Sequence, residues 1–498
     1  MKRVITSLVV TMLMLASAAI GKTQAQSQTF TIDDLLKVRR VSDPQVSPDG
    51  RWIAYTIADT DKPANKRTTQ VYLISVDGGE ARQLTSEKQS STSPRWSPDG
   101  KRLAFVSARD GESQIWVMDV EGGGVKKITN ISTGADGPVW SPDGKWIAFT
   151  SEVYPECTTD ECNKNRVEQV AQSKVKAKIA DRLLYRHWTS WKEGKRTHVF
   201  VASAEAGATG AVARDLTPGD YDAPPFSQGG PPDYAFSPDS KELAFARNTD
   251  KVEAISTNGD IFIVPVSGDA AQAAARRITG DNPANDISPL YSPDGRYIAY
   301  RAQSKPGFES DRWRLMLYDR KTGQSHSLTE QLDYNVEGFS FSPDGQRVYL
   351  AVGERGRQPI YEVSVAGGSM KKLIADGVND DVQVSADGKM MVFTRQSLTR
   401  PIEIYRAAID GAGVAQVTKT NDAFLADFNL KPAEEVTWEG AAGAKVQGWV
   451  VKPANFTANK KWPLVVLIHG GPQGSWSDSW SYRWNPQVFA AAGYVVFT

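Results

Sequence analysis

Short stretches in which apolar and polar side chains alternate recur along the chain from about residue 46 to residue 430. Residues 101–105 (KRLAF) and 145–149 (KWIAF) are two examples, and each follows the same kind of turn. A period of two is typical of a β-strand with one buried face. A third alternating run follows, as at residues 114–118, and then a short fourth run that ends in Leu-Thr or Ile-Thr. The pattern predicts units of four strands, the composition of a propeller blade.

The turn between the first two strands of each unit has a repeated sequence, Ser-Pro-Asp-Gly. Proline presets φ for a type I turn, Asp bonds to nearby main chain, and Gly adopts the left-handed conformation that returns the chain as a hairpin. Successive repeats begin 43 to 55 residues apart, except for one interval of 96 residues. This spacing is typical of stacked blades. We therefore expect an all-β seven-bladed propeller over residues 46–430, with repeats or close variants that begin at Ser47, Ser97, Ser141, Ser237, Ser292, Ser342 and Ser385.

The long interval between the third and fourth repeats predicts an insertion at about residues 152–196. It contains both cysteines of the chain, Cys157 and Cys162. In an exported protein their spacing favours a local disulfide, with two free thiols as the alternative. A zinc site would need two more ligands, and no His or Cys pair stands nearby, so we expect no metal.

The N-terminus has the three parts of a secretory signal peptide. Lys2 and Arg3 precede an apolar run over residues 4–20, and small residues follow. We assign residues 1–25 to the signal peptide and residues 26–45 to a short helix and linker. A membrane anchor is the alternative, because the run of about 17 residues is at the lower limit for a span. We expect an exported protein, periplasmic or secreted, without a stable membrane anchor.

Composition places the chain among globular proteins and disfavours one class of partner. Of 498 residues, 40% are hydrophobic and 23% are charged, which is enough apolar mass for two cores. Fifty-eight basic residues offset fifty-eight acidic ones, and the sequence has no long basic stretch. Because nucleic-acid-binding proteins show a basic stripe, we expect no nucleic-acid partner.

Residues 431–498 differ from the repeats and predict a second domain. Residues 463–469 read as a buried strand that leads into His469-Gly470-Gly471-Pro472, and a strand followed by His-Gly-Gly supplies one oxyanion donor in α/β-hydrolases. A helix over residues 484–492 and a strand over 494–497 follow, so we expect the N-terminal part of an α/β-hydrolase domain. The sequence has no Gly-x-Ser-x-Gly nucleophile motif, and we expect the catalytic Ser, Asp and His beyond Thr498.

The signal peptide, the seven turns and the segment LIHGGPQG at residues 467–474 together resemble the prolyl oligopeptidase family of serine peptidases. Residues 185–188 (YRHW), the cysteine loop and residues 480–486 are most similar to its secreted bacterial and fungal members of the type called dipeptidyl peptidase 5. The resemblance implies acyl transfer through a Ser nucleophile, without a cofactor, on short peptides that the propeller admits. It leaves open an oligomer of the full-length enzyme.

The resemblance also implies roles for particular residues. The main-chain N–H of Gly471 would be one oxyanion donor. Glu152 and Glu156 would be candidates for the anion that binds the ammonium group of the substrate. Trp480 and Trp484 would wall an apolar pocket for the residue before the cleaved bond, with core packing as the alternative.

We therefore expect a secreted serine-type exopeptidase that releases dipeptides, with the propeller as a substrate filter. One alternative is an acylaminoacyl peptidase, which would prefer N-acetylated peptides to free ones. The other is a non-enzymatic periplasmic binding propeller of the TolB type, which would have no use for the strand and the His-Gly-Gly loop. We expect residues 1–498 alone to be inactive, because an oxyanion donor without a nucleophile leaves no covalent step to accelerate.

Overall fold

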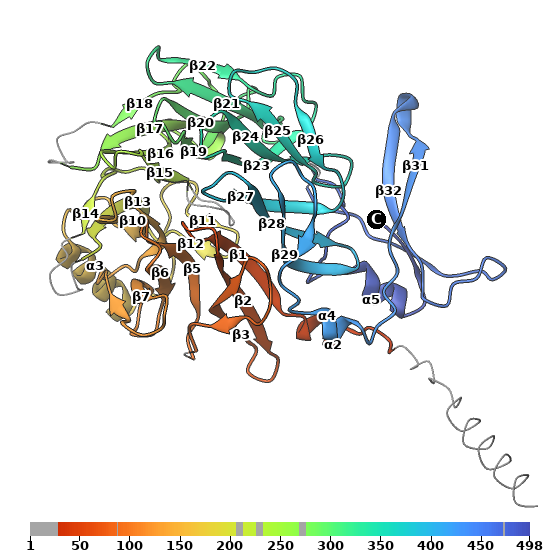
Figure 1. Ribbon diagram of the computed structural model, residues 1–498. Coiled ribbons are helices and arrows are strands. Elements are labelled where there is room, and N and C mark those ends of the chain that lie inside the picture. The colour runs from red at the N-terminus through yellow and green to blue at the C-terminus, as the bar shows by residue number, and fades with distance from the viewer. Residues whose placement is uncertain (1–27, 87, 206–212, 226–232, 268–274, 472–473) are drawn as a thin grey trace, which may run out of the picture.

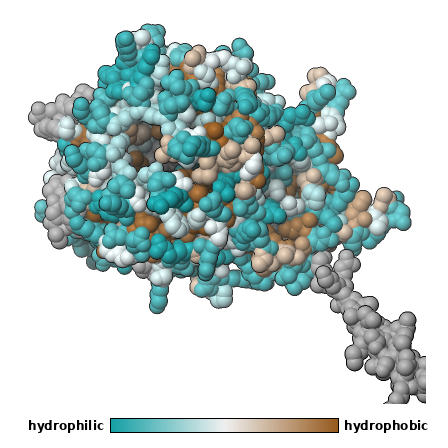
Figure 2. Space-filling view, viewed as in Figure 1, coloured by the Kyte–Doolittle hydropathy of each residue, from teal (hydrophilic) through white to brown (hydrophobic). Residues whose placement is uncertain are grey.

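The computed structural model describes residues 28–86, 88–205, 213–225, 233–267, 275–471 and 474–498. The predicted signal peptide and Pro472 lie outside the described residues. Over the described part of the chain, residues 40–416 form seven four-stranded sheets that stand side by side around a ring (Figure 1). Figure 2 shows a hollow near the middle of this ring, in a face that is otherwise mostly hydrophilic.

Neighbouring strands in each of these sheets are antiparallel, and they follow one another in the sequence except in the third sheet, where an insertion separates two of them. The first strands of most neighbouring sheets contact one another, so they line the middle of the ring. The bounds, sheet by sheet, are β1 (Arg40–Val46), β2 (Trp52–Asp61), β3 (Lys66–Ser75) and β4 (Arg82–Gln83); β5 (Ser91–Trp96), β6 (Arg102–Ser107), β7 (Gln114–Asp119) and β8 (Lys126–Lys127); β9 (Asp136–Trp140), β10 (Trp146–Val153), β13 (Arg196–Ser203) and β14 (Arg214–Asp215); β15 (Tyr234–Phe236), β16 (Glu242–Asn248), β17 (Gly259–Pro265) and β18 (Arg276–Arg277); β19 (Asp286–Tyr291), β20 (Tyr297–Ala302), β21 (Arg314–Asp319) and β22 (Gln324–Ser327); β23 (Asn335–Phe341), β24 (Arg347–Gly353), β25 (Ile360–Ser364) and β26 (Lys371–Ile374); β27 (Val378–Val384), β28 (Met390–Ser397), β29 (Arg400–Ala408) and β30 (Ala415–Gln416).

Each Ser-Pro-Asp-Gly turn is held by hydrogen bonds that its own residues make. In the second sheet the buried Ser97 hydroxyl donates to Asp99 Oδ1 at 2.5 Å and accepts the main-chain N–H of Arg102 at 2.9 Å. The hydrogen bond from Ser97 outweighs burial and lowers the pKa of Asp99. Gly100 adopts a φ of +69°, and a Cβ there would lie 3.6 Å from Cδ of Pro48 in the preceding turn. The turns therefore pack against one another around one face of the ring.

The first and seventh sheets close the ring through side chains. The Val46 N–H donates to Oε1 of Gln383 at 2.9 Å, and the Arg39 N–H donates to Oδ1 of Asn421 at 2.9 Å. Apolar residues of both sheets, among them Ile53 and Ile404, share one core. Because each sheet is built from its own consecutive strands over the described residues, closure depends on these side-chain contacts.

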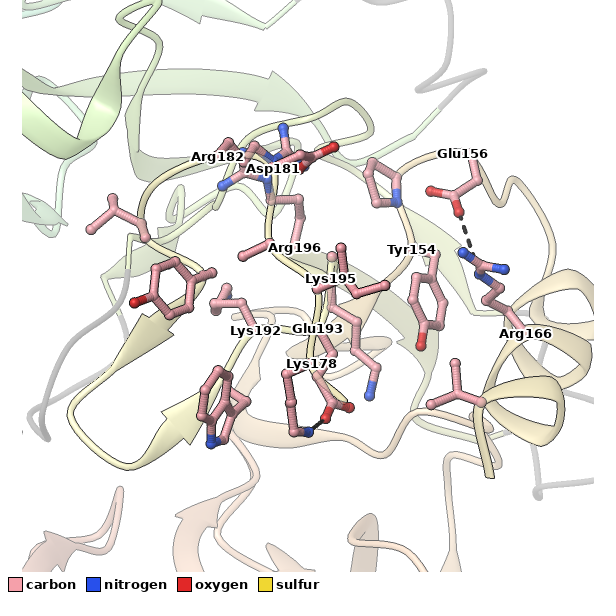
Figure 3. Close-up of a pocket in the computed structure, with 18 of the residues that line it drawn as sticks. Tyr154, Glu156, Arg166, Lys178, Asp181, Arg182, Lys192, Glu193, Lys195 and Arg196 are labelled. Carbon is pink, nitrogen blue, oxygen red and sulfur yellow. Dashed lines mark hydrogen bonds and ion pairs between the residues drawn. The ribbon is translucent and has the colours of Figure 1, made fainter. Parts of the chain in front are cut away.

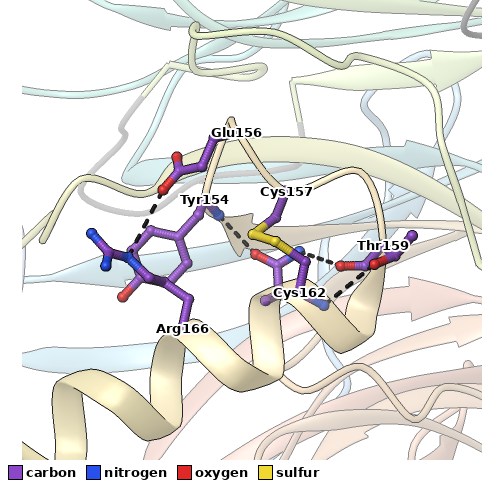
Figure 4. Close-up of a disulfide and its surroundings, with 7 residues drawn as sticks. Tyr154, Glu156, Cys157, Thr159, Cys162 and Arg166 are labelled. Carbon is purple, nitrogen blue, oxygen red and sulfur yellow. Dashed lines mark hydrogen bonds and ion pairs between the residues drawn. A yellow bond between two sulfur atoms is a disulfide. The ribbon is translucent and has the colours of Figure 1, made fainter.

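An insertion connects β10 to β13 and lies within the third sheet's sequence. It contains helix α3 (Asp160–Gln172) and the hairpin β11 (Arg186–His187) and β12 (Ser190–Trp191). A disulfide joins Cys157 to Cys162 at the start of α3, as predicted from their spacing (Figure 4). The Thr159 side chain caps the helix by accepting the main-chain N–H of Cys162.

The C-terminal residues form a separate sheet of β31 (Glu434–Glu439), β32 (Lys445–Val451), β33 (Leu464–Val466) and β34 (Val495–Phe497), in the order β31-β32-β34-β33. Helix α5 (Pro486–Ala491) lies between β33 and β34 in the sequence, and these two strands are parallel. The prediction of a buried strand over residues 463–469 is correct about the strand but wrong about its burial. Strand β33 forms the edge of the sheet, and Leu464 and Val466 are 60% and 50% exposed, because no described residue covers them.

The C-terminal sheet docks on the face of the ring opposite the turns. The Asp478 N–H donates to the carbonyl of Gly356 at 2.7 Å, and the Leu398 N–H donates to Oδ1 of Asp478 at 2.8 Å. Gly356 and Leu398 lie in loops that follow the second strand of their sheets, β24 and β28. The insertion also follows a second strand, β10, so it emerges on the face that carries the C-terminal sheet. The remaining short helices are α2 (Ile32–Lys37), α4 (Asp422–Leu425), η1 (Glu253–Ile255) and η2 (Ala441–Gly443).

Candidate functional site

A network of buried charges lies where the insertion returns to the third sheet. Lys192 Nζ lies 2.7 Å from Oδ1 of Asp222, and Nη1 of Arg196 lies 3.0 Å from Oδ2 of the same carboxylate. Arg196 also pairs with Asp220 at 2.8 Å and with Glu253 at 2.6 Å. Burial opposes the ionisation of Asp222, but the charges of Lys192 and Arg196 outweigh it and lower the pKa of this carboxyl. Asp222 therefore stays ionised at neutral pH, where both cations hold it.

Glu152 stands at the open end of this network. Its carboxylate lies 3.5 Å from Lys192 Nζ, and its side chain is 48% exposed while that of Lys192 is only 6% exposed. Lys192 is held more closely by Asp222, so Glu152 is the carboxylate with the weakest partner. The paired cations are Arg182, Lys192 and Arg196, whereas the carboxylates are Glu152, Asp220, Asp222 and Glu253. Four carboxylates thus face three cations, and Glu152 has the longest of these ion pairs.

Glu156 lies in different surroundings. It lines a cavity of about 1140 Å³ within the insertion, where its Oε1 lies 3.9 Å from Nε of Arg166 (Figure 3). A second ion pair in this cavity joins Lys178 to Glu193. Among the charged lining residues that do not belong to the network of Glu152, four are basic and three are acidic, so Glu156 faces no excess of negative charge. The charged lining residues are Glu156, Arg166, Lys176, Lys178, Asp181, Arg182, Lys192, Glu193, Lys195, Arg196 and Asp220.

The His-Gly-Gly loop follows β33 and is open to solvent. His469 and Gly471 are both exposed, and Nδ1 of His469 lies 2.9 Å from the carbonyl oxygen of Gly470. Gly471 has a φ of +128°, a conformation that favours glycine over residues with a side chain. The loop therefore needs glycine at the position from which an oxyanion donor is predicted.

The two candidate tryptophans have different environments. Trp480 is 5% exposed and packs with Phe30 and Phe428, and its ring centroid lies 5.8 Å from that of Phe30. The packing alternative therefore describes Trp480 among the residues that the structure describes. Trp484 is 53% exposed and remains a candidate contact for a ligand.

Sequence reasoning missed the residues that surround Glu152. Asp222 is 30 residues from Lys192 in the sequence, and Glu253 is 57 residues from Arg196. Asp222 lies between β14 and β15, and Glu253 lies between β16 and β17. One signal was present: Arg196 opens a strand whose next residues are mostly buried, and a buried arginine requires anionic partners. Over the described residues, no cluster of His, Cys, Asp or Glu could hold a metal ion. No described helix has the length and apolar character to span a membrane.

Comparison with known proteins finds relatives of this chain by sequence. A family model for the TolB beta propeller domain matches residues 35–182 and 287–435. The chain is 31% identical to dipeptidyl-peptidase 5 of Porphyromonas gingivalis over 470 residues, which cover 94% of this chain and 67% of that protein. It is 32% identical to dipeptidyl-peptidase 5 of Porphyromonas endodontalis over 95% of this chain and 67% of that protein. The chain therefore spans about two thirds of the length of these curated relatives.

Solved structures share the fold at lower identity. An acylaminoacyl peptidase in complex with Z-Gly-Gly-Phe-chloromethyl ketone matches with a TM-score of 0.72 and 17% identity, over 94% of this chain and 66% of that one. The acylaminoacyl peptidase of Pyrococcus horikoshii matches with a TM-score of 0.71 and the same identity and coverage. Fold and sequence together define a propeller-bearing peptidase. The chain belongs to the prolyl oligopeptidase family of serine peptidases. The two relatives described above, at 31% and 32% identity, are both dipeptidyl-peptidases 5.

Proposed function

We propose that this chain provides the substrate-selecting and oxyanion-binding parts of an exported serine exopeptidase that releases dipeptides from short peptides. The observation that carries the proposal is the position of Glu152. It is an exposed carboxylate, it belongs to a network in which four carboxylates face three cations, and it lies on the face of the ring that bears the C-terminal sheet. An enzyme that cleaves at a fixed distance from a free N-terminus needs an anion that binds the substrate's ammonium group, and this anion must lie on the face where the substrate binds.

The C-terminal sheet supplies the second part of the proposal. We interpret its β33, α5 and β34 as the opening of an α/β-hydrolase domain, in which the N–H of Gly471 donates to the oxyanion that develops during acyl transfer. Loss of one such donor raises the barrier by about 2.7–4 kcal/mol in enzymes of this type. The seven sheets would then be the blades of a filter that admits short peptides to the face between the two parts.

A product analysis tests this function. A hexapeptide with a free N-terminus is incubated with the full-length polypeptide, and the products are identified by mass spectrometry. The proposal expects a dipeptide from the N-terminus to appear first, together with the remaining tetrapeptide. Release of single residues, internal cleavage, or cleavage of only the N-acetylated hexapeptide would contradict it, and the last result would indicate an acylaminoacyl peptidase.

A further inference from the structure

Two arginines of the first sheet have no carboxylate partner among the residues that the structure describes. Arg40 is the first residue of β1, and Arg67 is the second residue of β3. The guanidinium carbon of Arg40 lies 4.2 Å from the ring centroid of Tyr482, which follows the His-Gly-Gly loop in the sequence. Burial lowers the pKa of Arg40, and the positive charge of Arg67 lowers it further. Arg40 pairs with Ala58 and Arg67 pairs with Thr60 on the intervening strand β2, so both side chains leave the same face of the first sheet.

Neither side chain has an anion among the residues that the structure describes. The Nε of Arg40 is buried and makes no hydrogen bond there. The adjacent Arg39 is different, because it donates to both carboxylate oxygens of Asp59 at 2.7 and 3.0 Å. Glu403 is a buried carboxylate whose negative charge contributes to the raised pKa of Tyr482. It already accepts hydrogen bonds from the Thr418 hydroxyl at 2.6 Å and from the Asn421 N–H at 3.0 Å.

An uncompensated guanidinium that is partly withdrawn from water is costly, and the cost falls when an anion binds. Arginine presents donors in a planar fork that matches a carboxylate. Arg40 is partly buried and Arg67 is exposed, so an anion from solution can reach the pair. Arg40 and Arg67 lie at the starts of β1 and β3, on the face that also carries Glu152 and the C-terminal sheet.

We propose that Arg40 and Arg67 bind the free C-terminal carboxylate of a short peptide substrate. This inference rests on the proposed function and extends it, because Glu152 takes the ammonium end of the same zwitterion. Among the described residues, four carboxylates face three cations at the third sheet, and two arginines of the first sheet have no carboxylate partner. This charge arrangement is complementary to a peptide with both termini free. The protein then selects short peptides by their two charged ends as well as by their size.

The test compares two tetrapeptides that differ only at the C-terminus, one a free acid and one an amide, with the full-length polypeptide. A dipeptidyl-aminomethylcoumarin, which has no carboxylate, reports the exopeptidase activity by itself. We expect the free acid to have a roughly tenfold higher kcat/KM than the amide, mainly through KM. Arg67→Gln and Arg40→Gln should abolish this preference.

The matched control is Arg51→Gln, an exposed arginine in the turn of the first sheet on the opposite face, which should retain the preference. If the wild-type protein hydrolyses the coumarin substrate but treats acid and amide alike, the inference is overturned while the proposed function stands. The same holds if Arg67→Gln keeps the preference. If the coumarin substrate is not hydrolysed at all, the proposed function itself fails.

Discussion

The ammonium of Lys192 lies 3.5 Å from the carboxylate of Glu152, farther than the 2.7 Å that separates it from Asp222. Lys192 is therefore committed to the buried carboxylate and leaves Glu152 only partly neutralised. This asymmetry makes Glu152 available to a second cation at low cost, since an exposed group gives up little hydration when it pairs.

Glu152→Gln should weaken the binding of peptides with a free N-terminus. The substitution keeps the shape of the side chain and removes its charge, so the Michaelis constant should rise about tenfold, which corresponds to about 1.4 kcal/mol of binding. Steady-state kinetics of the full-length polypeptide with a free dipeptidyl substrate measure this change. Glu156→Gln is the control, because Glu156 lies among basic side chains and should leave the constant nearly unchanged. Equal effects of the two substitutions would count against the role of Glu152.

Trp480→Ala should destabilise the protein, whereas Trp484→Ala should not. Removal of a buried tryptophan lowers the free energy of unfolding by roughly 3–5 kcal/mol. Here it would also leave a cavity in the core that Trp480 shares with Phe30 and Phe428. An exposed tryptophan costs within about 0.5 kcal/mol. Chemical denaturation of both variants provides the comparison. A loss for Trp480→Ala as small as the one expected for Trp484→Ala would show that the packing of Trp480 contributes little.

The stability of the protein should depend on pH through Asp286. Burial raises the pKa of Asp286 to about 8 from the value of 3.8 in an unfolded chain. The folded state therefore binds the proton more tightly, and the stability this group contributes is complete below about pH 4 and is lost as the pH rises to about 8. At pH 8 its buried Oδ2 has no hydrogen-bond partner among the described residues, a situation that costs roughly 1–3 kcal/mol.

Asp286→Asn should remove this dependence, so the melting temperature of the variant relative to wild type should increase between pH 5 and pH 8. Asp294→Asn serves as the control, because the hydrogen bond from Ser292 lowers the pKa of Asp294 and keeps that group ionised throughout this range. Its difference from wild type should stay constant with pH. A constant difference for Asp286→Asn as well would refute the assignment.

The turns and strands could be predicted because their determinants are local. Ser97 and Asp99 complete their hydrogen bonds within five residues of sequence, and the alternation of apolar side chains follows directly from strand geometry. The position of the insertion follows from spacing alone, because a blade has a nearly constant length. The cysteines lie five positions apart, so their pairing needed no knowledge of the fold.

The remaining features depend on contacts between distant residues. The apolar run at Leu464 and Val466 indicates a strand, but its burial depends on what packs against it, and it is an edge strand in the described residues. An aromatic residue such as Trp480 suits a pocket wall and a core equally well from sequence. The partners of Glu152 come from loops that only the closed ring brings together, so no local pattern could identify them.

The most direct test of this account compares a free dipeptidyl-aminomethylcoumarin with its N-acetylated counterpart, using the full-length polypeptide and its Glu152→Gln variant. We expect the wild-type protein to hydrolyse the free substrate with a kcat/KM at least tenfold higher, and the variant to lose most of this preference. A wild-type protein that favours the acetylated substrate, or a preference that survives in the variant, would contradict the assignment of Glu152 as the ammonium-binding group.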